Sequence, residues 1–263
     1  MSEINSPLHG RRAVVTGAGR GIGRSIALAL AAAGADVAVS ARSQAEIEGV
    51  AEQLRALGRR ALAITCDVTD PAQVAQMADA AVAGLGGVDI LINNAGIATS
   101  HKFLDHPDEL WHQILAINLT GVYYVTKALV PHMVAQRAGR IITIASIAAK
   151  AGARYIAAYT ASKHGVLGLT RALAAELVAY NITVNAICPG YVDTPMTDGN
   201  IANIVKRTGM SAAQVRETME KTSPQNRLIE PEEVAALAVY LAQDSARGIT
   251  GQAINVDGGS VMF

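Results

Sequence analysis

Ala13-Val14-Val15-Thr16-Gly17-Ala18-Gly19-Arg20-Gly21-Ile22-Gly23 joins an apolar, strand-like run to a glycine-rich turn. The run that follows, Ser25-Ile26-Ala27-Leu28-Ala29-Leu30, has helical character. Glycines permit positive φ angles and close backbone approach, and the free N–H groups at a helix N-terminus receive a pyrophosphate. Strand, turn and helix therefore come in the order that a dinucleotide-binding site requires.

The spacing of these glycines departs from the fingerprint G-x-G-x-x-G. Counting from Gly17 puts Ile22 where the third glycine belongs, so the pattern is T-G-x-x-x-G-x-G. A glycine-rich turn after a strand can also be purely structural. Cofactor binding therefore needs a second, independent signal.

That signal is the pair Tyr159 and Lys163, with Ser146 upstream. Residues four apart share one helix face, so the phenol and the ammonium project side by side. A phenol titrates near ~10 in isolation, and an adjacent cation is expected to lower its pKa toward that of a general acid or base. Ser146 follows the apolar run 141–145 and would be delivered to the rim of a sheet. The alternative is an amphipathic helix with a buried ring and a snorkelling lysine.

With both signals present, the sequence resembles the short-chain dehydrogenase/reductase family from about Arg11 to Gly259. Further matching motifs follow in the family's order: Asn93-Asn94-Ala95-Gly96, Asn118, Pro189-Gly190-Tyr191-Val192-Asp193-Thr194, and Val256-Asp257-Gly258-Gly259. Each motif is weak alone, but their common order is specific.

Alternation of apolar strands with longer amphipathic stretches predicts an α/β fold, a single-domain, Rossmann-like, doubly wound parallel sheet with helices on both faces. About seven strands are expected, near 12–16, 36–41, 61–66, 88–92, 140–145, 182–187 and 252–256. Residues 1–10 are expected to form a loose N-terminal arm and residues 11–263 the single domain. The irregular stretch 193–230 is expected to be a substrate lid.

Composition favours a small-molecule partner. The 263 residues carry a formal net charge of +0 and no block of like charges, which argues against binding to nucleic acid or an anionic membrane. No apolar stretch reaches the ~20 residues of a spanning helix, and the N-terminus lacks a signal-peptide core, so a cytoplasmic protein is expected. Cys66 and Cys188 lack metal-ligand spacing, so we expect packing roles and no metal site.

The choice between NADP(H) and NAD(H) is expected to be made at the end of the second strand. An NAD site usually presents a carboxylate there, but the position holds Ala41, and Asp36 precedes the strand. Arg42 and Arg20 could instead hold a 2′-phosphate. NADP(H) is the prediction, with NAD as the alternative; Arg42 could also be an ordinary solvated cation.

The family resemblance implies the remaining roles. Cofactor contacts would come from Gly17, Arg20, Gly21, Ile22, Gly23, Arg42, Asp67, Val68, Asn94, Gly96, Tyr159, Lys163, Pro189, Gly190, Val192 and Thr194. Asp67 could instead cap a helix, for which Asp70 is the stronger candidate. Candidate substrate contacts are Ser146, Ala148, Ile156, Tyr159, Tyr191 and Met196, with Ile147, Tyr155, Met210 and Met219 as further pocket candidates.

The resemblance also implies a reaction. Tyr159 would protonate a ketone oxygen that Ser146 polarises, while hydride comes from the nicotinamide. Lys163 would lower the tyrosine pKa and hold the nicotinamide ribose, and Asn118 would hold a proton-relay water. A 3-oxoacyl thioester or a related ketone is the expected substrate, and a homotetramer the expected assembly. The alternatives are an NAD-dependent secondary alcohol or 3-hydroxyacid dehydrogenase and a non-catalytic nucleotide-binding regulator.

Overall fold

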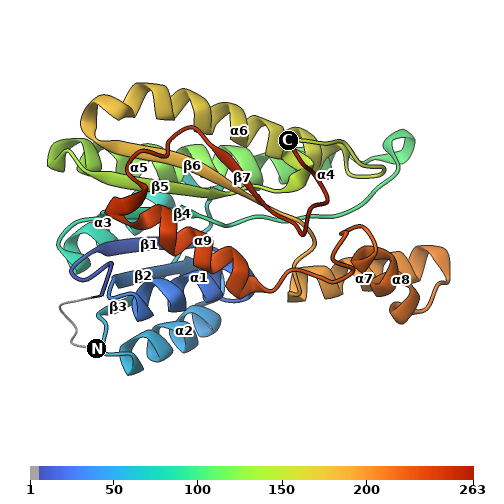
Figure 1. Ribbon diagram of the computed structural model, residues 1–263, viewed down its shortest axis with the longest axis horizontal. Coiled ribbons are helices and arrows are strands. Elements are labelled where there is room, and N and C mark those ends of the chain that lie inside the picture. The colour runs from blue at the N-terminus through green and yellow to red at the C-terminus, as the bar shows by residue number, and fades with distance from the viewer. Residues whose placement is uncertain (1–5) are drawn as a thin grey trace.

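The computed structural model describes residues 6–263, which contain one parallel sheet in the order β3-β2-β1-β4-β5-β6-β7 (Figure 1). The chain turns back from β1 to β4 at the centre, as in a doubly wound fold, so the predicted α/β Rossmann-like architecture is confirmed. The strands are β1 Arg12–Thr16, β2 Asp36–Ala41, β3 Ala61–Thr65, β4 Ile90–Asn93, β5 Gly139–Ile144, β6 Ile182–Pro189 and β7 Ala253–Val256.

The central strands form because their side chains are buried on both faces of the sheet. All residues of β4 and β6 are buried, and β1 is buried after its first residue. Such strands read as nearly continuous apolar runs, which is why the sequence revealed them. The predicted strands lie within two residues of the observed ends.

Helices cover both faces of the sheet. In Figure 1, α1, α2 and α9 lie on one face and α3, α5 and α6 on the other. The helices are α1 Gly21–Ala32, α2 Gln44–Ala56, α3 Pro71–Leu85, α4 Asp108–Leu115, α5 Gly121–Gln136, α6 Ala157–Leu177, α7 Pro195–Thr208, α8 Ala212–Glu220 and α9 Pro231–Ala242. Short 3₁₀ turns are η2 Phe103–Asp105, η4 Ile147–Ala149, η5 Val178–Tyr180 and η6 Asp244–Ala246.

Helices α4 and α5 are joined by η3, a π-helical turn over Ala116–Thr120. By length and composition, the combined run Asp108–Gln136 could cross a membrane, with a mean hydropathy of 1.3. However, 44% of the apolar window is buried, and α5 contacts α3, α6 and strands β4 and β5. We therefore interpret the run as a core helix.

The predicted loose arm is docked over the part that the structure describes. Leu8 is 1% exposed, and its N–H donates to the Ala33 carbonyl at 2.9 Å. Gly34 accommodates this segment with φ +105°, since a Cβ there would lie 2.9 Å from the Ser6 Cβ. Burial of one apolar side chain holds the arm against α1; residues 1–5 lie outside the described chain.

The expected lid region contains α7 and α8, which project beyond the sheet at the right of Figure 1. They share a small core of their own: Ile201, Val215, Met219 and Leu228. The two ends of the segment are tied together, because Ile229 N–H donates to Tyr191 O at 2.8 Å and Asp193 N–H donates to Ile229 O at 2.9 Å. The projecting segment is thus a compact helical unit whose two connections to the rest of the chain hydrogen-bond to each other.

Candidate active site

Ser146 lies just beyond the carboxyl end of β5, as predicted. Its backbone is extended, and its Oγ accepts a hydrogen bond from Ala148 N–H at 3.1 Å, which caps η4. A hydroxyl that accepts from the backbone keeps its own hydrogen for another acceptor. The cap therefore fixes Ser146 while leaving it able to donate to a bound oxygen atom.

Tyr159 and Lys163 lie one turn apart on α6, beside this serine. The Lys163 Nζ lies 5.7 Å from the centroid of the Tyr159 ring and donates to the carbonyl oxygen of Ile144 at 2.7 Å. Tyr159 also hydrogen-bonds the Ser146 side chain. The structure therefore brings the three predicted side chains together at the end of β5.

Burial governs the electrostatics of the pair. It raises the pKa of Tyr159, and the hydrogen bond with Ser146 opposes this rise without cancelling it. Burial also lowers the pKa of Lys163 to about 8. The phenol pKa, expected to be lowered, is therefore raised in this structure, because desolvation outweighs the hydrogen bond with Ser146. The effect of Lys163 on this pKa stays a prediction. A raised pKa keeps the phenol protonated at neutral pH.

Asn118 is fully buried in the π-helical turn η3. Its Oδ1 accepts from Ile97 N–H at 2.9 Å, while its Nδ2 donates to Ile97 O at 2.9 Å and to Ser162 Oγ at 3.2 Å. Ser162 Oγ in turn donates to the carbonyl oxygen of Tyr159 at 2.7 Å. The Asn118 side chain thus links the loop after β4 to the first turns of α6. Sequence reasoning missed Ile97 and Ser162, which carry no motif of their own.

The glycine turn between β1 and α1 is as tight as predicted. Gly17 and Gly21 have φ angles of +62° and +54°. A Cβ on Gly23 would lie 2.4 Å from both Asn94 Nδ2 and the Gly17 carbonyl oxygen. The Asn94 amide fills this space, donating to Thr16 O at 3.0 Å and Gly17 O at 2.9 Å. Asn94 therefore braces the turn with its side chain, a role the sequence analysis did not assign.

Arg20 and Arg42 differ in their surroundings. Arg20 is the N-cap residue of α1, and its Nη1 lies 3.7 Å from Glu46 Oε1, an ion pair with both side chains partly exposed. The Glu46 carboxylate also covers Gly19, where a Cβ would lie 2.8 Å from Oε2. Arg42 is exposed, and its side chain makes no hydrogen bond or ion pair with the described residues. Glu46, in the first turn of α2, was missed because only the folded chain brings it to the turn.

Other predicted cofactor residues surround the same edge of the sheet. Thr194 is 9% exposed and lies against Gly21, and Gly190 lies against Asp257 beyond β7. Val68 packs on Gly121 at the start of α5. The Thr194 contact places the segment after β6 against the glycine turn, while the other two join the ends of β6 and β7 and bring the segment after β3 against α5.

Asp67 and Asp70 follow β3. Asp67 accepts from Thr69 N–H at 2.9 Å and Thr69 Oγ1 at 2.8 Å, so it closes a local turn. Asp70 caps α3 by accepting from Ala72 N–H, with Pro71 in the first turn. The assignment of the cap to Asp70 is confirmed.

The candidate substrate residues divide into two groups. Tyr155, Tyr191 and Met196 are 54%, 42% and 46% exposed, as residues around an open site would be. Tyr155 has a φ of +69°, an uncommon backbone for a bulky residue and one found at functional sites. Met219 is 5% exposed and lies in the α7–α8 core, so it packs inside the projecting segment. Ala148 is buried and donates its N–H to Ser146 Oγ, and Ile156 precedes α6.

Cys188 is buried in β6 near Tyr159 and Lys163, and burial raises the pKa of its thiol. Burial likewise raises the pKa of Cys66 to about 11. Both thiols are therefore neutral packing groups near pH 7. Within residues 6–263, no group of three or more His, Cys, Asp and Glu side chains could hold a metal ion.

Comparison with known proteins gives a consistent result. A family model described as enoyl-(acyl carrier protein) reductase matches residues 17–261. The putative ketoacyl reductase 1 of the granaticin polyketide synthase of Streptomyces violaceoruber is 42% identical over 249 residues, covering 94% of this chain and 92% of that protein. The D-beta-hydroxybutyrate dehydrogenase of Rhizobium meliloti (strain 1021) is 39% identical, covering 95% and 98%. A crystal structure of a variant actinorhodin polyketide ketoreductase with NADPH aligns with a TM-score of 0.93 and 38% identity, covering 96% of this chain and 98% of that one.

Proposed function

The chain belongs to the short-chain dehydrogenase/reductase family of oxidoreductases, and from this premise we propose that it reduces a ketone to a secondary alcohol with NADPH. The observation that carries the proposal is the convergence of Ser146, Tyr159 and Lys163 at the end of β5. A protonated phenol, an oriented hydroxyl and a buried amine in one site are the groups that carbonyl reduction needs.

A dinucleotide fits the glycine turn. Gly17 and Gly23 leave no room for a Cβ, which would lie 2.8 Å from Ala95 Cα and 2.4 Å from Asn94 Nδ2, so these glycines let the turn pack tightly against the segment after β4. The N-terminus of α1 supplies free N–H groups and a positive dipole. When bound there, the nicotinamide cofactor supplies the hydride. We propose that the predicted residues around this edge, from Gly17 to Thr194, hold it.

The protein's own groups handle the proton. In the proposed reaction Tyr159 donates its phenolic proton to the substrate carbonyl oxygen as hydride reaches the carbonyl carbon, and Ser146 donates a hydrogen bond to the same oxygen. Lys163 binds the nicotinamide ribose and favours the phenolate that proton transfer leaves. Its hydrogen bond to Ile144 fixes the ammonium at the site.

We assign Asn118 to positioning and to the proton relay. Its side chain is engaged by Ile97 and Ser162, so a relay water would bind beside the π-helical turn and not displace these bonds. π-Helical turns are frequent at functional sites, which supports the assignment.

NADP(H) is the proposed cofactor because Arg20 and Arg42 flank the end of β2, where Ala41 supplies no carboxylate for a ribose 2′-hydroxyl. Arg42, whose side chain pairs with none of residues 6–263, is available to a 2′-phosphate, and Arg20 would exchange Glu46 for it. The related actinorhodin ketoreductase was solved with NADPH, which supports the same choice.

The proposed substrate is a 3-oxoacyl thioester or a related ketone. Tyr155, Tyr191 and Met196 are exposed apolar or aromatic groups that would receive an acyl chain at the open face of the site. The name of the granaticin relative, a ketoacyl reductase, supports this class. The two chain segments that join α7 and α8 to the rest of the protein are hydrogen-bonded to each other, which supports the proposed role of the α7–α8 segment as a lid.

The second candidate is an NAD-dependent dehydrogenase that oxidises a secondary alcohol or 3-hydroxyacid. The related D-beta-hydroxybutyrate dehydrogenase favours it, and Glu46 beside Arg20 would disfavour a 2′-phosphate. A non-catalytic nucleotide-binding regulator would not need the Tyr159 and Lys163 pair. Initial rates with NADPH and NADH on a panel of ketones and 3-oxoacyl thioesters test all three. NADPH-dependent reduction is the expected result; a preference for NADH, or nucleotide binding without turnover, would contradict it.

The cytoplasmic location and the homotetramer remain proposals. The exposed Tyr123 on α5 and the length of α6 suit helix-mediated contacts between copies. Fractionation of the producing cells would test the location. Light scattering on the purified protein, or size-exclusion chromatography at several concentrations, would test the oligomeric state.

A further inference from the structure

A cavity of about 350 Å³ opens at the end of the sheet opposite the candidate active site. It lies at the amino ends of β4, β5 and β6, beside the turn η6 that follows α9. A volume of this size is at the lower end of the range for small-molecule sites. None of the residues assigned to the proposed reaction lines it.

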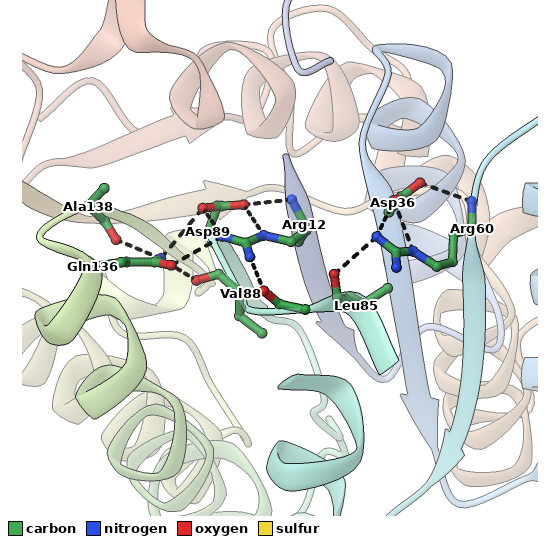
Figure 2. A network of polar contacts seen from close by, with 9 residues as sticks. Arg12, Asp36, Arg60, Leu85, Val88, Asp89, Gln136 and Ala138 are labelled. Atoms are coloured by element: carbon green, nitrogen blue, oxygen red, sulfur yellow. Dashed lines mark hydrogen bonds and ion pairs between the residues drawn. The ribbon is translucent and has the colours of Figure 1, made fainter. Parts of the chain in front are cut away.

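The charged groups around the cavity do not balance. Three arginines line it, Arg11, Arg140 and Arg247, against two aspartates, Asp89 and Asp244. Asp89 is already neutralised by an arginine outside the lining: it accepts from Arg12 Nε at 2.8 Å and Nη2 at 2.9 Å, and from the Arg12 backbone N–H at 2.9 Å (Figure 2). Asp244 is therefore left as the counterion of three guanidinium groups.

Asp244 is a shared and exposed counterion. Its carboxylate accepts from Arg11 Nη2 at 2.9 and 2.8 Å and from Arg140 Nη2 at 3.1 Å, while 64% of its side chain remains exposed. Arg247 is exposed and makes no side-chain hydrogen bond or ion pair within residues 6–263. One carboxylate thus serves two arginines and leaves the third without a partner in the described chain.

Arg140 is the most constrained of the three. Its side chain is only 12% exposed, and its Nη1 donates to the Gly139 carbonyl at 2.9 Å. Its Nε is buried without a hydrogen-bond partner in the described chain. Burial lowers the pKa of Arg140; Asp244 opposes this effect and the neighbouring Arg11 adds to it. The shared and exposed Asp244 balances the charge of this guanidinium only in part, so an anion bound in the cavity would stabilise it.

One neutral donor is also available. Thr250 lines the cavity, and its Oγ1 accepts from Val184 N–H at 3.1 Å, which leaves the hydroxyl hydrogen free to donate. Planar guanidinium groups and a hydroxyl together match the oxygens of a phosphate or carboxylate.

We propose that this cavity binds a small oxyanion, a phosphate or a carboxylate, through Arg140, Arg247 and Arg11, with Thr250 as a neutral donor. The site is separate from the nucleotide site and does not depend on the function proposed above. The occupant neutralises the positive charge that Asp244 leaves unbalanced.

The test is calorimetric titration of the intact protein with inorganic phosphate and, separately, with citrate, at an ionic strength matched with sodium chloride. The protein is first saturated with whichever nicotinamide nucleotide it binds, so that the glycine turn does not take up the probe. Saturable binding of either probe is expected. Binding of phosphate alone or citrate alone identifies the preferred oxyanion.

Arg247→Gln is the decisive variant because this exposed side chain supports no contact of the fold. It should weaken binding by about tenfold or more, and Arg247→Glu should weaken it further. The matched control is Arg207→Gln, an exposed arginine at the end of α7, which should bind as the wild type does. Absence of saturable binding of both probes, or unchanged affinity in Arg247→Gln, would overturn the proposal.

Discussion

Lys163 donates a hydrogen bond from Nζ to the carbonyl oxygen of Ile144, 2.7 Å away, in the last residue of β5. The next two residues of the chain lead to Ser146, so one strand end positions the lysine and the serine together. This bond compensates part of the desolvation of a 5%-exposed ammonium. It also means that helix α6 has to keep its position against the end of strand β5 for the site to form.

The first prediction concerns the proposed acid. Tyr159→Phe removes the proton donor but keeps the ring that packs beside Lys163. Turnover should fall by at least about 100-fold, the usual contribution of general acid catalysis, with little change in nucleotide affinity. Steady-state kinetics and nucleotide titration on the same preparation measure both quantities. Turnover close to that of the wild type would remove Tyr159 from the mechanism.

Lys163→Met should separate activity from stability. The variant should lose turnover and yet be more stable than the wild type near pH 7. Its free energy of unfolding should be larger by roughly 1–2 kcal/mol, because a buried ammonium is replaced by an apolar side chain of similar length. Chemical denaturation at a series of pH values measures this difference. A variant less stable than the wild type at pH 7 would show that the bond to Ile144 outweighs desolvation.

The sign of the pH dependence follows from the depressed pKa of Lys163, about 8 when folded against 10.5 as the ordinary value. Between these values the unfolded wild type binds more protons than the folded protein, so wild-type stability rises with pH across this window. The advantage of Lys163→Met should therefore be complete below about pH 8 and shrink toward pH 10.5. An advantage that stays constant over this range would assign it to packing alone.

Much of the fold was predictable because its signals are local. Buried parallel strands read as apolar runs, and the glycines from Gly17 to Gly23 mark the turn directly in the sequence. The spacing of Tyr159 and Lys163 likewise depends only on helix geometry. These local features were predictable because the tertiary structure keeps them unchanged.

The features that were missed depend on contacts between distant segments. Leu8 is held at the C-terminal end of α1, where its N–H donates to the Ala33 carbonyl. The π-helical turn at Asn118 lies where that side chain hydrogen-bonds the backbone of Ile97. The positive φ of Tyr155 could not be predicted because the position does not hold a glycine. The pKa of Tyr159 depends on how deeply the phenol is buried, which spacing along a helix does not determine.

The glycine turn gives a prediction with an internal control. Gly23→Ala places a Cβ 2.4 Å from Asn94 Nδ2 and the Gly17 carbonyl oxygen, and Asn94 would have to leave the turn that it braces. We expect about 1–3 kcal/mol of destabilisation and loss of nucleotide binding. Urea unfolding and nucleotide titration measure the two effects.

The control is Gly49→Ala, in the middle of α2, where a Cβ would meet no atom within 4 Å. It should increase stability by about 0.5–1 kcal/mol through helix propensity and leave nucleotide binding unchanged. Equal effects of the two substitutions would mean that the space at Gly23 is not what the turn requires.

The final prediction tests the ion pair at the cofactor edge. If Arg20 exchanges Glu46 for a 2′-phosphate, then Glu46→Gln should tighten NADP(H) binding, because a competing partner and a repelling carboxylate both disappear. The pair is 3.7 Å apart and partly exposed, so a gain of about two- to five-fold is expected, smaller at high salt. Affinity for NAD(H), which lacks the 2′-phosphate, should stay the same. Glu48→Gln is the matched control, since this residue of α2 pairs with Arg55 at 3.8 Å and not with Arg20. A gain for both nucleotides, or the same gain in Glu48→Gln, would show that Glu46 acts on net charge and not on the phosphate that distinguishes them.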